Sequence, residues 1–185
     1  MKEKKEQIIS RENREVPDFS KGILTEEILW YFGRVTTPKL SPDEQQLLFG
    51  VKYFDYHANK GNLELYTMPI TGGEPIKITT TAQDEIEAIW RPDGKKIAYL
   101  FPDKEGVLQI WESNPDGKEL KQISHEKSDI TAFSYSPTQS HIMYSQNVRL
   151  DPTIAERYPD LPEANAKIYD DLMYRHWNSW ADGTY

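Results

Sequence analysis

The feature that most constrains the fold is a segment that recurs along the chain at a nearly fixed spacing. Residues 89–99, IWRPDGKKIAY, resemble residues 134–144, SYSPTQSHIMY, and Pro137 follows Pro92 by 45 residues. The same spacing relates three further pairs: Leu65 with Ile110, Gly72 with Gly117, and Thr79 with Ser124. An earlier copy, LSPDEQQLLF, starts at Leu40, and its five additional residues are assigned to a loop at 52–61. The chain is therefore expected to fold as a series of similar units.

Each unit combines four short apolar runs with turns built from Pro, Asp and Gly. In the second unit we expect strands at 86–91, 96–102, 107–112 and 119–124. Proline presets φ and glycine supplies a positive φ, so the Pro-Asp-Gly and Asp-Gly sequences predict hairpin corners. Four short strands in about 45 residues are typical of a propeller blade. The alternating pairs should then be buried between adjacent blades: Ile97 with Tyr99, and Leu108 with Ile110.

Other architectures fit this pattern less well. Ankyrin and tetratricopeptide units are helical, and the repeat has no helical periodicity. A β-sandwich stays open as the alternative, although a sandwich has no reason to repeat its strands in register. Propellers use roughly 4 to 8 blades, and residues 37–185 supply about three. We therefore expect an all-β fold, an incomplete propeller of about three blades in a piece of a longer protein.

The first 36 residues do not follow the repeat. Residues 1–18 mix Lys, Glu and Arg with few apolar side chains, which predicts a flexible arm. Within 19–36, Thr25 is placed as the N-cap of a short helix that ends at Gly33. Three apolar residues of this helix share one face and should lie on a core: Ile28, Leu29 and Phe32.

Composition excludes several classes of function. Lys and Arg total 22 against 30 Asp and Glu, and a net charge of −8 disfavours a nucleic-acid partner. No apolar run approaches the roughly 20 residues of a membrane span, and the first residues lack the apolar stretch of a signal peptide. With zero cysteines, disulfides, thiolate metal sites and a cysteine nucleophile are excluded. The residues leave the cellular compartment undetermined.

No catalytic residue, metal site or cofactor is expected in this chain. The sequence contains no Gly-x-Ser-x-Gly, the motif of a serine nucleophile on an α/β-hydrolase sheet. The four histidines do not have the spacing of metal ligands. The acidic run at 84–87 is interpreted as the solvated start of a strand.

Residues 171–180, DLMYRHWNSW, crowd polar and aromatic side chains beyond what a blade needs. Upstream prolines at 152, 159 and 162 disfavour a central strand, so residues 150–180 should leave the blade and return. A helical turn would place Trp177 and Trp180 on one side. Two interpretations remain: an aromatic plug that anchors this excursion, or a segment that lines a substrate cavity. The candidate cavity residues are Asp171, Arg175, His176 and Trp177.

Three stretches resemble the prolyl oligopeptidase family of serine peptidases. Residues 24–30, LTEEILW, followed by LSPD at 40–43, are similar to the opening of that family's propeller. The run WRPDGKKIAY at 90–99 resembles the WD-like repeat shared with the TolB protein. Residues 168–180, IYDDLMYRHWNSW, are similar to the third-blade excursion of the group that contains dipeptidyl peptidase five and bacterial acylaminoacyl peptidases.

The resemblance implies an N-terminal propeller that restricts the access of peptides to a serine exopeptidase and lines its substrate cavity. The implied partners are a peptide substrate and an α/β-hydrolase domain with a Ser-Asp-His triad. That domain is absent from these residues, so no triad residue is assigned. A periplasmic or secreted location is suggested in the same way. The alternative is a non-enzymatic TolB-like propeller that binds a protein or a carbohydrate. A Gly-x-Ser-x-Gly motif in the remainder of the open reading frame would favour the peptidase, and its absence would favour the binding propeller.

Overall fold

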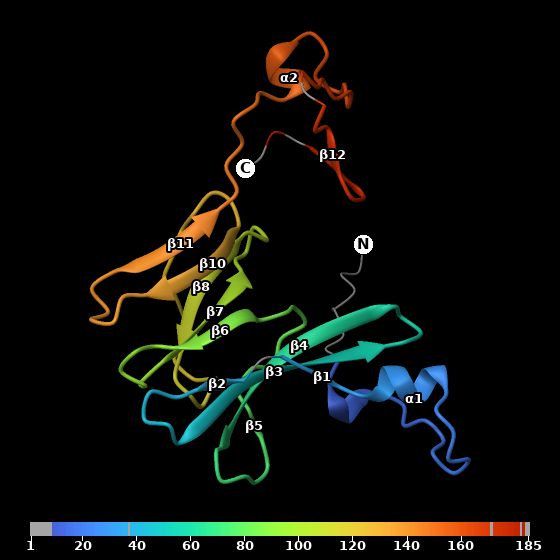
Figure 1. Ribbon diagram of the computed structural model, residues 1–185, viewed down its shortest axis with the longest axis vertical. Helices are drawn as coiled ribbons and strands as arrows, with labels where there is room; N and C mark the ends of the chain where they lie inside the picture. Colours follow the sequence, from blue (N-terminus) through green and yellow to red (C-terminus); the bar gives the residue numbers. More distant parts are fainter. Residues whose placement is uncertain (1–8, 37, 171, 182, 184–185) are drawn as a thin grey trace. The chain divides into compact units, whose positions relative to one another are not determined.

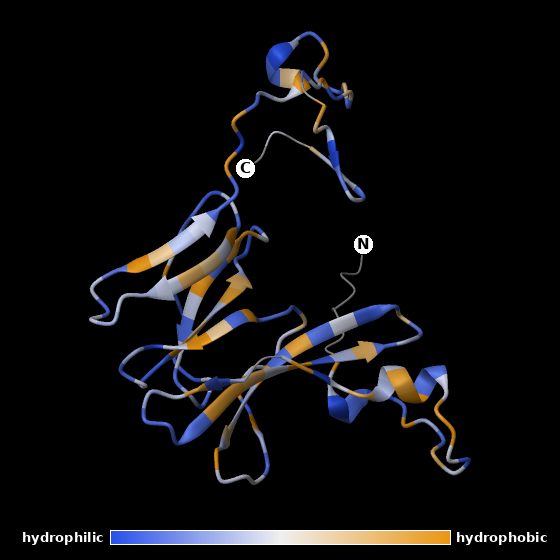
Figure 2. Ribbon diagram, viewed as in Figure 1, coloured by the Kyte–Doolittle hydropathy of each residue, from blue (hydrophilic) through white to orange (hydrophobic). Residues whose placement is uncertain are grey.

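A computed structural model describes residues 9–36, 38–170, 172–181 and 183 of the chain (Figure 1). The chain divides into two compact units, residues 1–145 and residues 146–185. In its described residues the first unit contains three antiparallel sheets that follow one another along the sequence. Hydrophobic residues lie along their strands, as Figure 2 shows. This arrangement confirms an incomplete propeller.

The first sheet is built around one long hairpin. Its strands are β1 (Arg34–Val35), β2 (Lys39–Leu40), β3 (Gln46–Asp55), β4 (Lys60–Pro69) and β5 (Ile76–Lys77). β3 pairs with β1, β2 and β4, and β5 pairs with the outer side of β4. The β3–β4 pairing runs from Gln46↔Pro69 to Asp55↔Lys60. The loop expected at 52–61 is therefore wrong, because most of the additional residues lengthen the two strands.

The second sheet agrees with the strands expected from the repeat. It consists of β6 (Ile86–Trp90), β7 (Ile97–Pro102), β8 (Leu108–Ser113) and β9 (Lys121–Gln122), in that order. The third sheet has two strands in the described residues, β10 (Ile130–Tyr135) and β11 (Ile142–Gln146). The second repeat thus forms a four-stranded blade, and the third repeat contributes its first hairpin.

One backbone hydrogen bond recurs in all three repeats and confirms their alignment. At the corner between the first two strands of each repeat, an amide N–H bonds a carbonyl oxygen five residues later, at 2.8–2.9 Å. The pairs are Ser41 with Gln46, Arg91 with Lys96, and Ser136 with His141. Each corner also places one residue at positive φ: Glu44, Gly94 and Gln139. Only one of these is glycine, so the corner geometry is kept even where the residue is unfavourable for it.

Two apolar cores fill the spaces between successive sheets. The first joins Leu48, Leu65 and Ile78 of the first repeat to Trp90, Ile97 and Tyr99 of the second. The second joins Ala98, Leu100 and Ile110 to Ile130 of the third repeat. Neighbouring residues of a strand point to opposite faces, so β7 supplies alternate residues to each core. The predicted burial of Ile97, Tyr99 and Ile110 is confirmed, whereas Leu108 is only half-buried.

A carboxylate at the start of one repeat bonds the preceding sheet, and this contact occurs twice. Asp84 Oδ1 accepts the backbone N–H of Leu63 at 2.6 Å. Asp129 Oδ1 accepts the N–H of Leu108 at 2.8 Å, and both residues lie 45 positions further on. The interpretation of 84–87 as a solvated strand start is therefore wrong for Asp84, because its carboxylate is hydrogen-bonded to the preceding sheet. It is also wrong for the buried Glu85.

The N-terminal region packs on the first sheet. Helix α1 (Glu26–Tyr31) begins after Thr25, whose Oγ1 accepts the N–H of Ile28 at 3.4 Å, so the predicted N-cap is confirmed. Ile28 is buried, but Leu29 and Phe32 are about half exposed, so the helix buries a narrower face than expected. The 3₁₀ turn η1 (Arg11–Asn13) precedes it. Upstream, the side chain of Ile9 is buried, although a flexible arm is expected there.

The second unit contains little regular structure. Helix α2 (Ile154–Arg157) has a capping box between Thr153 and Glu156. Strands β12 (Arg175–His176) and β13 (Ser179–Trp180) form a small hairpin. In the described residues from 147 to 174 no strand forms, in agreement with the three prolines. None of the helices described in this chain has the length and apolar character that crossing a membrane requires.

Candidate functional site

The hairpin β12–β13 brings three of the four candidate residues together. Arg175 pairs with Trp180 and His176 pairs with Ser179, so Trp177 and Asn178 form the turn. Trp177 has a φ of 51°, a left-handed conformation that is unfavourable for a bulky side chain. The segment forms this hairpin and not the helical turn that would place Trp177 and Trp180 on one side, so Trp177 lies at the tip of the hairpin.

A group of stacked aromatic rings supports the base of this hairpin. The rings of Tyr169, Tyr174 and Trp180 lie 5.7–6.2 Å apart between centroids. The guanidinium of Arg175 lies 5.4 Å from the centroid of the Trp180 ring, within cation–π range. The Tyr169 hydroxyl donates to the carbonyl of Ala181 at 3.1 Å, which ties the preceding segment to the end of the hairpin. These contacts fix Arg175 against the stack.

The three described candidates are all exposed to solvent. Trp177 is 88% exposed, whereas Trp180 in the stack is 51% exposed. Arg175 and His176 are exposed. Asp171, the fourth candidate, lies outside the described residues. Trp180 and Tyr174 pack against each other in the stack. Trp177 and His176, at and beside the exposed tip, are available for contact with another molecule.

A cavity of about 440 Å³ lies beside the stack in the second unit. Tyr169, Asp170 and Met173 line one part of it, and most of residues 149–157 line another. Its charged lining residues are the cations Arg149, Arg157 and Lys167 and the anions Asp151 and Asp170. Sequence reasoning did not find this cavity, because its walls come from irregular segments with no recurring pattern.

A larger cavity of about 670 Å³ lies in the first unit, formed by residues near the N-terminus, α1 and the tip of the β3–β4 hairpin. One of its residues, His57, is among the four histidines that lack the spacing of metal ligands. The 50-residue spacing between the first two repeats, against 45 later, was the available indication of an unusual structure here. In the described part of the chain, no group of three or more His, Asp or Glu side chains is placed to hold a metal ion.

Comparison with known proteins identifies relatives of the chain. Residues 24–175 match the family described as the TolB β-propeller domain, PD40. The chain is 34% identical over 159 residues to dipeptidyl-peptidase 5 of Porphyromonas gingivalis, an alignment that covers 86% of this chain and 23% of the relative. It is 29% identical over 161 residues to dipeptidyl-peptidase 5 of Porphyromonas endodontalis, with coverages of 87% and 23%. The chain thus spans about a quarter of the length of these curated relatives.

Solved structures share the fold. The acylaminoacyl peptidase of Pyrococcus horikoshii covers 80% of this chain with a TM-score of 0.59 and 15% identity, over 21% of its own chain. An acylaminoacyl peptidase in complex with Z-Gly-Gly-Phe-chloromethyl ketone covers 86% with a TM-score of 0.64 and 16% identity, over 23% of its own chain. At such identities the likeness concerns the fold alone. The chain resembles the propeller region of dipeptidyl-peptidase 5, a member of the prolyl oligopeptidase family. Because most of its residues match the family model, this chain belongs to the TolB β-propeller domain family.

Proposed function

We propose that this chain is the propeller part of a serine exopeptidase of the dipeptidyl or acylaminoacyl type, in which it restricts peptide access and lines the substrate cavity. The observation that carries the proposal is the 34% identity to a dipeptidyl-peptidase 5 over 86% of the chain. The exposed hairpin β12–β13 supplies candidate contacts to the peptide through Arg175, His176 and Trp177.

The enzymatic part of the proposal is tested on the complete protein that carries this chain. The full protein should release dipeptides or acylated amino acids from peptide substrates, and a serine-directed inhibitor should abolish the release. The 185-residue chain alone should hydrolyse none of these substrates, because it has no Gly-x-Ser-x-Gly nucleophile. A full protein without that motif and without peptide hydrolysis would instead favour a binding propeller, the function that the TolB family match alone would support.

The cavity-lining part is tested by replacing Arg175 and His176 with Ala in the full protein. We expect kcat/KM to fall while Tm changes little, because both side chains are exposed and the packing lost is the cation–π contact of Arg175 with Trp180. A control is Lys104→Ala, an exposed cation in a turn of the second blade, which should change neither kcat/KM nor Tm. A lowered Tm with normal kinetics would assign the hairpin to the aromatic plug instead.

A further inference from the structure

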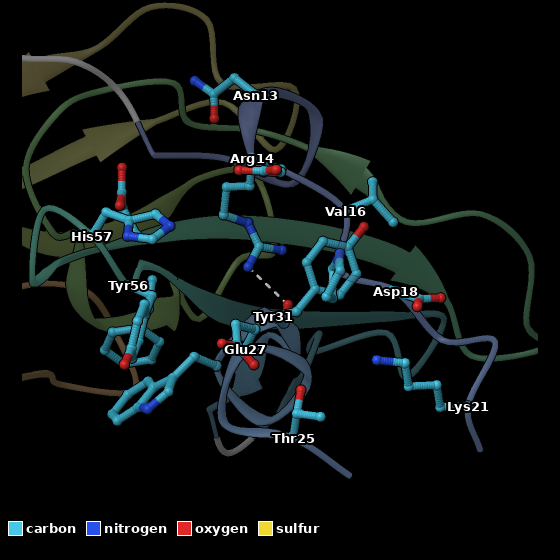
Figure 3. A pocket seen from close by; sticks show the side chains of 15 residues that line it. Asn13, Arg14, Val16, Asp18, Lys21, Thr25, Glu27, Tyr31, Tyr56 and His57 are labelled. Carbon is cyan, nitrogen blue, oxygen red and sulfur yellow. Dashed lines mark hydrogen bonds between the residues drawn. The ribbon is translucent and has the colours of Figure 1, made fainter. Parts of the chain in front are cut away.

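The 670 Å³ cavity of the first unit has the size of a ligand site and belongs to neither apolar core. Residues 13–18 form one wall, helix α1 a second, and residues 54–57 at the tip of the β3–β4 hairpin a third (Figure 3). In Figure 3, the Arg14 side chain reaches into the cavity between His57 and Tyr31. All residues that line this cavity belong to the first unit.

The third wall exists because the first blade departs from the repeat. By the 50-residue spacing, Lys52 is the counterpart of Pro102, where strand β7 of the second blade ends. Strand β3 continues to Asp55, and a tight turn follows before Lys60. Residues 54–57 therefore have no counterpart in the second blade. The residues that lengthen the β3–β4 hairpin belong to neither apolar core but supply one wall of the cavity. This indicates that the cavity has a role.

The lining of this cavity combines aromatic rings with an excess of carboxylates. The aromatic residues are Trp30, Tyr31, Phe54 and Tyr56. Four acidic residues, Glu15, Asp18, Glu27 and Asp55, stand against two basic ones, Arg14 and Lys21. Asp18 accepts hydrogen bonds from the backbone N–H and the side chain of Ser20, and Asp55 accepts the N–H of Ala58. The Glu27 carboxylate is bonded by its own backbone N–H and by the Thr25 side chain at the start of α1. A carboxylate has two oxygens with about four acceptor positions, so each of these can accept a further donor.

The positive charge of Arg14 is already committed to the protein. Its Nη1 donates to the carbonyl of Tyr31 at 2.8 Å, and its Nε donates to the carbonyl of Ser10 at 3.3 Å. Its guanidinium lies 4.6 Å from the ring centroids of both Tyr31 and Tyr53. The aromatic residues here thus already accept a guanidinium at cation–π distance, and a second instance places Arg34 5.8 Å from the Trp30 ring.

We propose that this cavity binds the guanidinium or ammonium group of a basic peptide side chain, held between the aromatic rings and the carboxylates of Glu15 and Glu27. Aromatic faces and carboxylates both favour a cation, and a chain with a net charge of −8 attracts one at long range. The site is independent of the exopeptidase proposal, because it needs neither the hairpin β12–β13 nor a catalytic domain.

The test is a calorimetric titration of the 185-residue chain with Nα-acetyl-L-arginine amide. Nα-acetyl-L-norleucine amide is the uncharged control, and Nα-acetyl-L-glutamate amide is the anionic one. The arginine probe should bind at least about tenfold more tightly than either control, and its affinity should fall as salt is raised. The single variants Glu15→Gln and Glu27→Gln should each weaken it severalfold, and Tyr56→Ala should weaken it as well.

A matched control is Glu105→Gln, which removes an exposed carboxylate from a turn of the second blade and should leave binding unchanged. Circular dichroism identifies any variant that fails to fold, and Glu15→Gln lies outside the helix and the sheet. The proposal is overturned if the arginine and norleucine probes bind equally, if neither binds, or if both folded carboxylate variants bind like the parent. Preferential binding of the glutamate probe would assign the cavity to an anion through Lys21.

Discussion

Glu85 is a buried acid at a position where the next repeat has an apolar residue. Its side chain is 1% exposed, and its carboxylate accepts hydrogen bonds from Thr79 Oγ1 at 2.9 Å and Thr81 Oγ1 at 2.6 Å. The residue 45 positions later is Ile130, which is fully buried in the second core. Burial raises the pKa of Glu85 to about 7, although the two threonine hydroxyls oppose that shift.

This pKa predicts a pH-dependent contribution to stability. The native state holds the Glu85 proton more tightly than the unfolded chain, whose ordinary pKa is 4.5. The contribution is therefore complete below about pH 4.5 and is lost as the pH rises through 7. Relative to Glu85→Gln, the parent should lose up to about 3 kcal/mol of unfolding free energy over this interval.

Urea denaturation at several pH values measures this difference. The exposed Glu105→Gln serves as the control and should leave the pH dependence of the parent unchanged. If the parent and Glu85→Gln had parallel stability curves from pH 4.5 to 7.5, Glu85 would titrate normally in the folded protein.

At the scale of single elements, two turns of the second blade share an Asp-Gly sequence but have different surroundings. Gly94 and Gly117 each follow an aspartate that accepts the N–H two residues later at 3.0 Å, and each has a positive φ. A Cβ on Gly94 would meet only Pro42, at an ordinary distance of 3.7 Å. A Cβ on Gly117 would overlap the carbonyl oxygen of Ile78, at the end of the first repeat.

The two turns should therefore respond differently to alanine. Gly94→Ala places alanine in the left-handed region and should cost about 1 kcal/mol of unfolding free energy. Gly117→Ala adds a backbone overlap with Ile78 and should cost about 2–4 kcal/mol. Thermal or urea denaturation of both variants checks the order, and equal losses would mean that the turn at Gly117 can move away from Ile78 without penalty.

The strands were predictable because their causes are local. Alternating apolar residues and Asp-Gly corners lie within a few positions of one another, so the second blade was placed to within a residue or two. The β3–β4 extension was missed because Tyr56 and His57 are not typical turn residues. The hairpin with Trp177 at its tip was missed because Trp-Asn is not a preferred turn sequence. Stacking of the Trp180 ring on Tyr169 stabilises this hairpin instead.

At the scale of the whole molecule, the third sheet leaves apolar surface uncovered. In the described residues it has two strands, and on β11 Met143 is 75% exposed on one face while Tyr144 is 43% exposed on the other. An open sheet edge and an apolar face favour association with another chain. We expect the isolated chain to self-associate in a concentration-dependent way.

Light scattering and binding of a hydrophobic dye measure this association. Met143→Lys should reduce both, because a charge on the uncovered face opposes pairing. Ile70→Lys, in the turn after β4, is the control and should change neither. A parent that stays monomeric at high concentration with low dye binding would show that the third sheet is not an association surface.

The paired contacts of Asp84 with Leu63 and of Asp129 with Leu108 also determine how motions are shared along the chain. Each backbone amide lies in one sheet, while the carboxylate that protects it lies at the start of the next repeat. Hydrogen exchange at Leu108 therefore reports the opening of the third repeat, and exchange at Leu63 reports the opening of the second. Each repeat therefore protects an amide N–H of the sheet before it from hydrogen exchange. When one repeat opens, an amide in the preceding sheet is exposed, while more distant sheets stay closed.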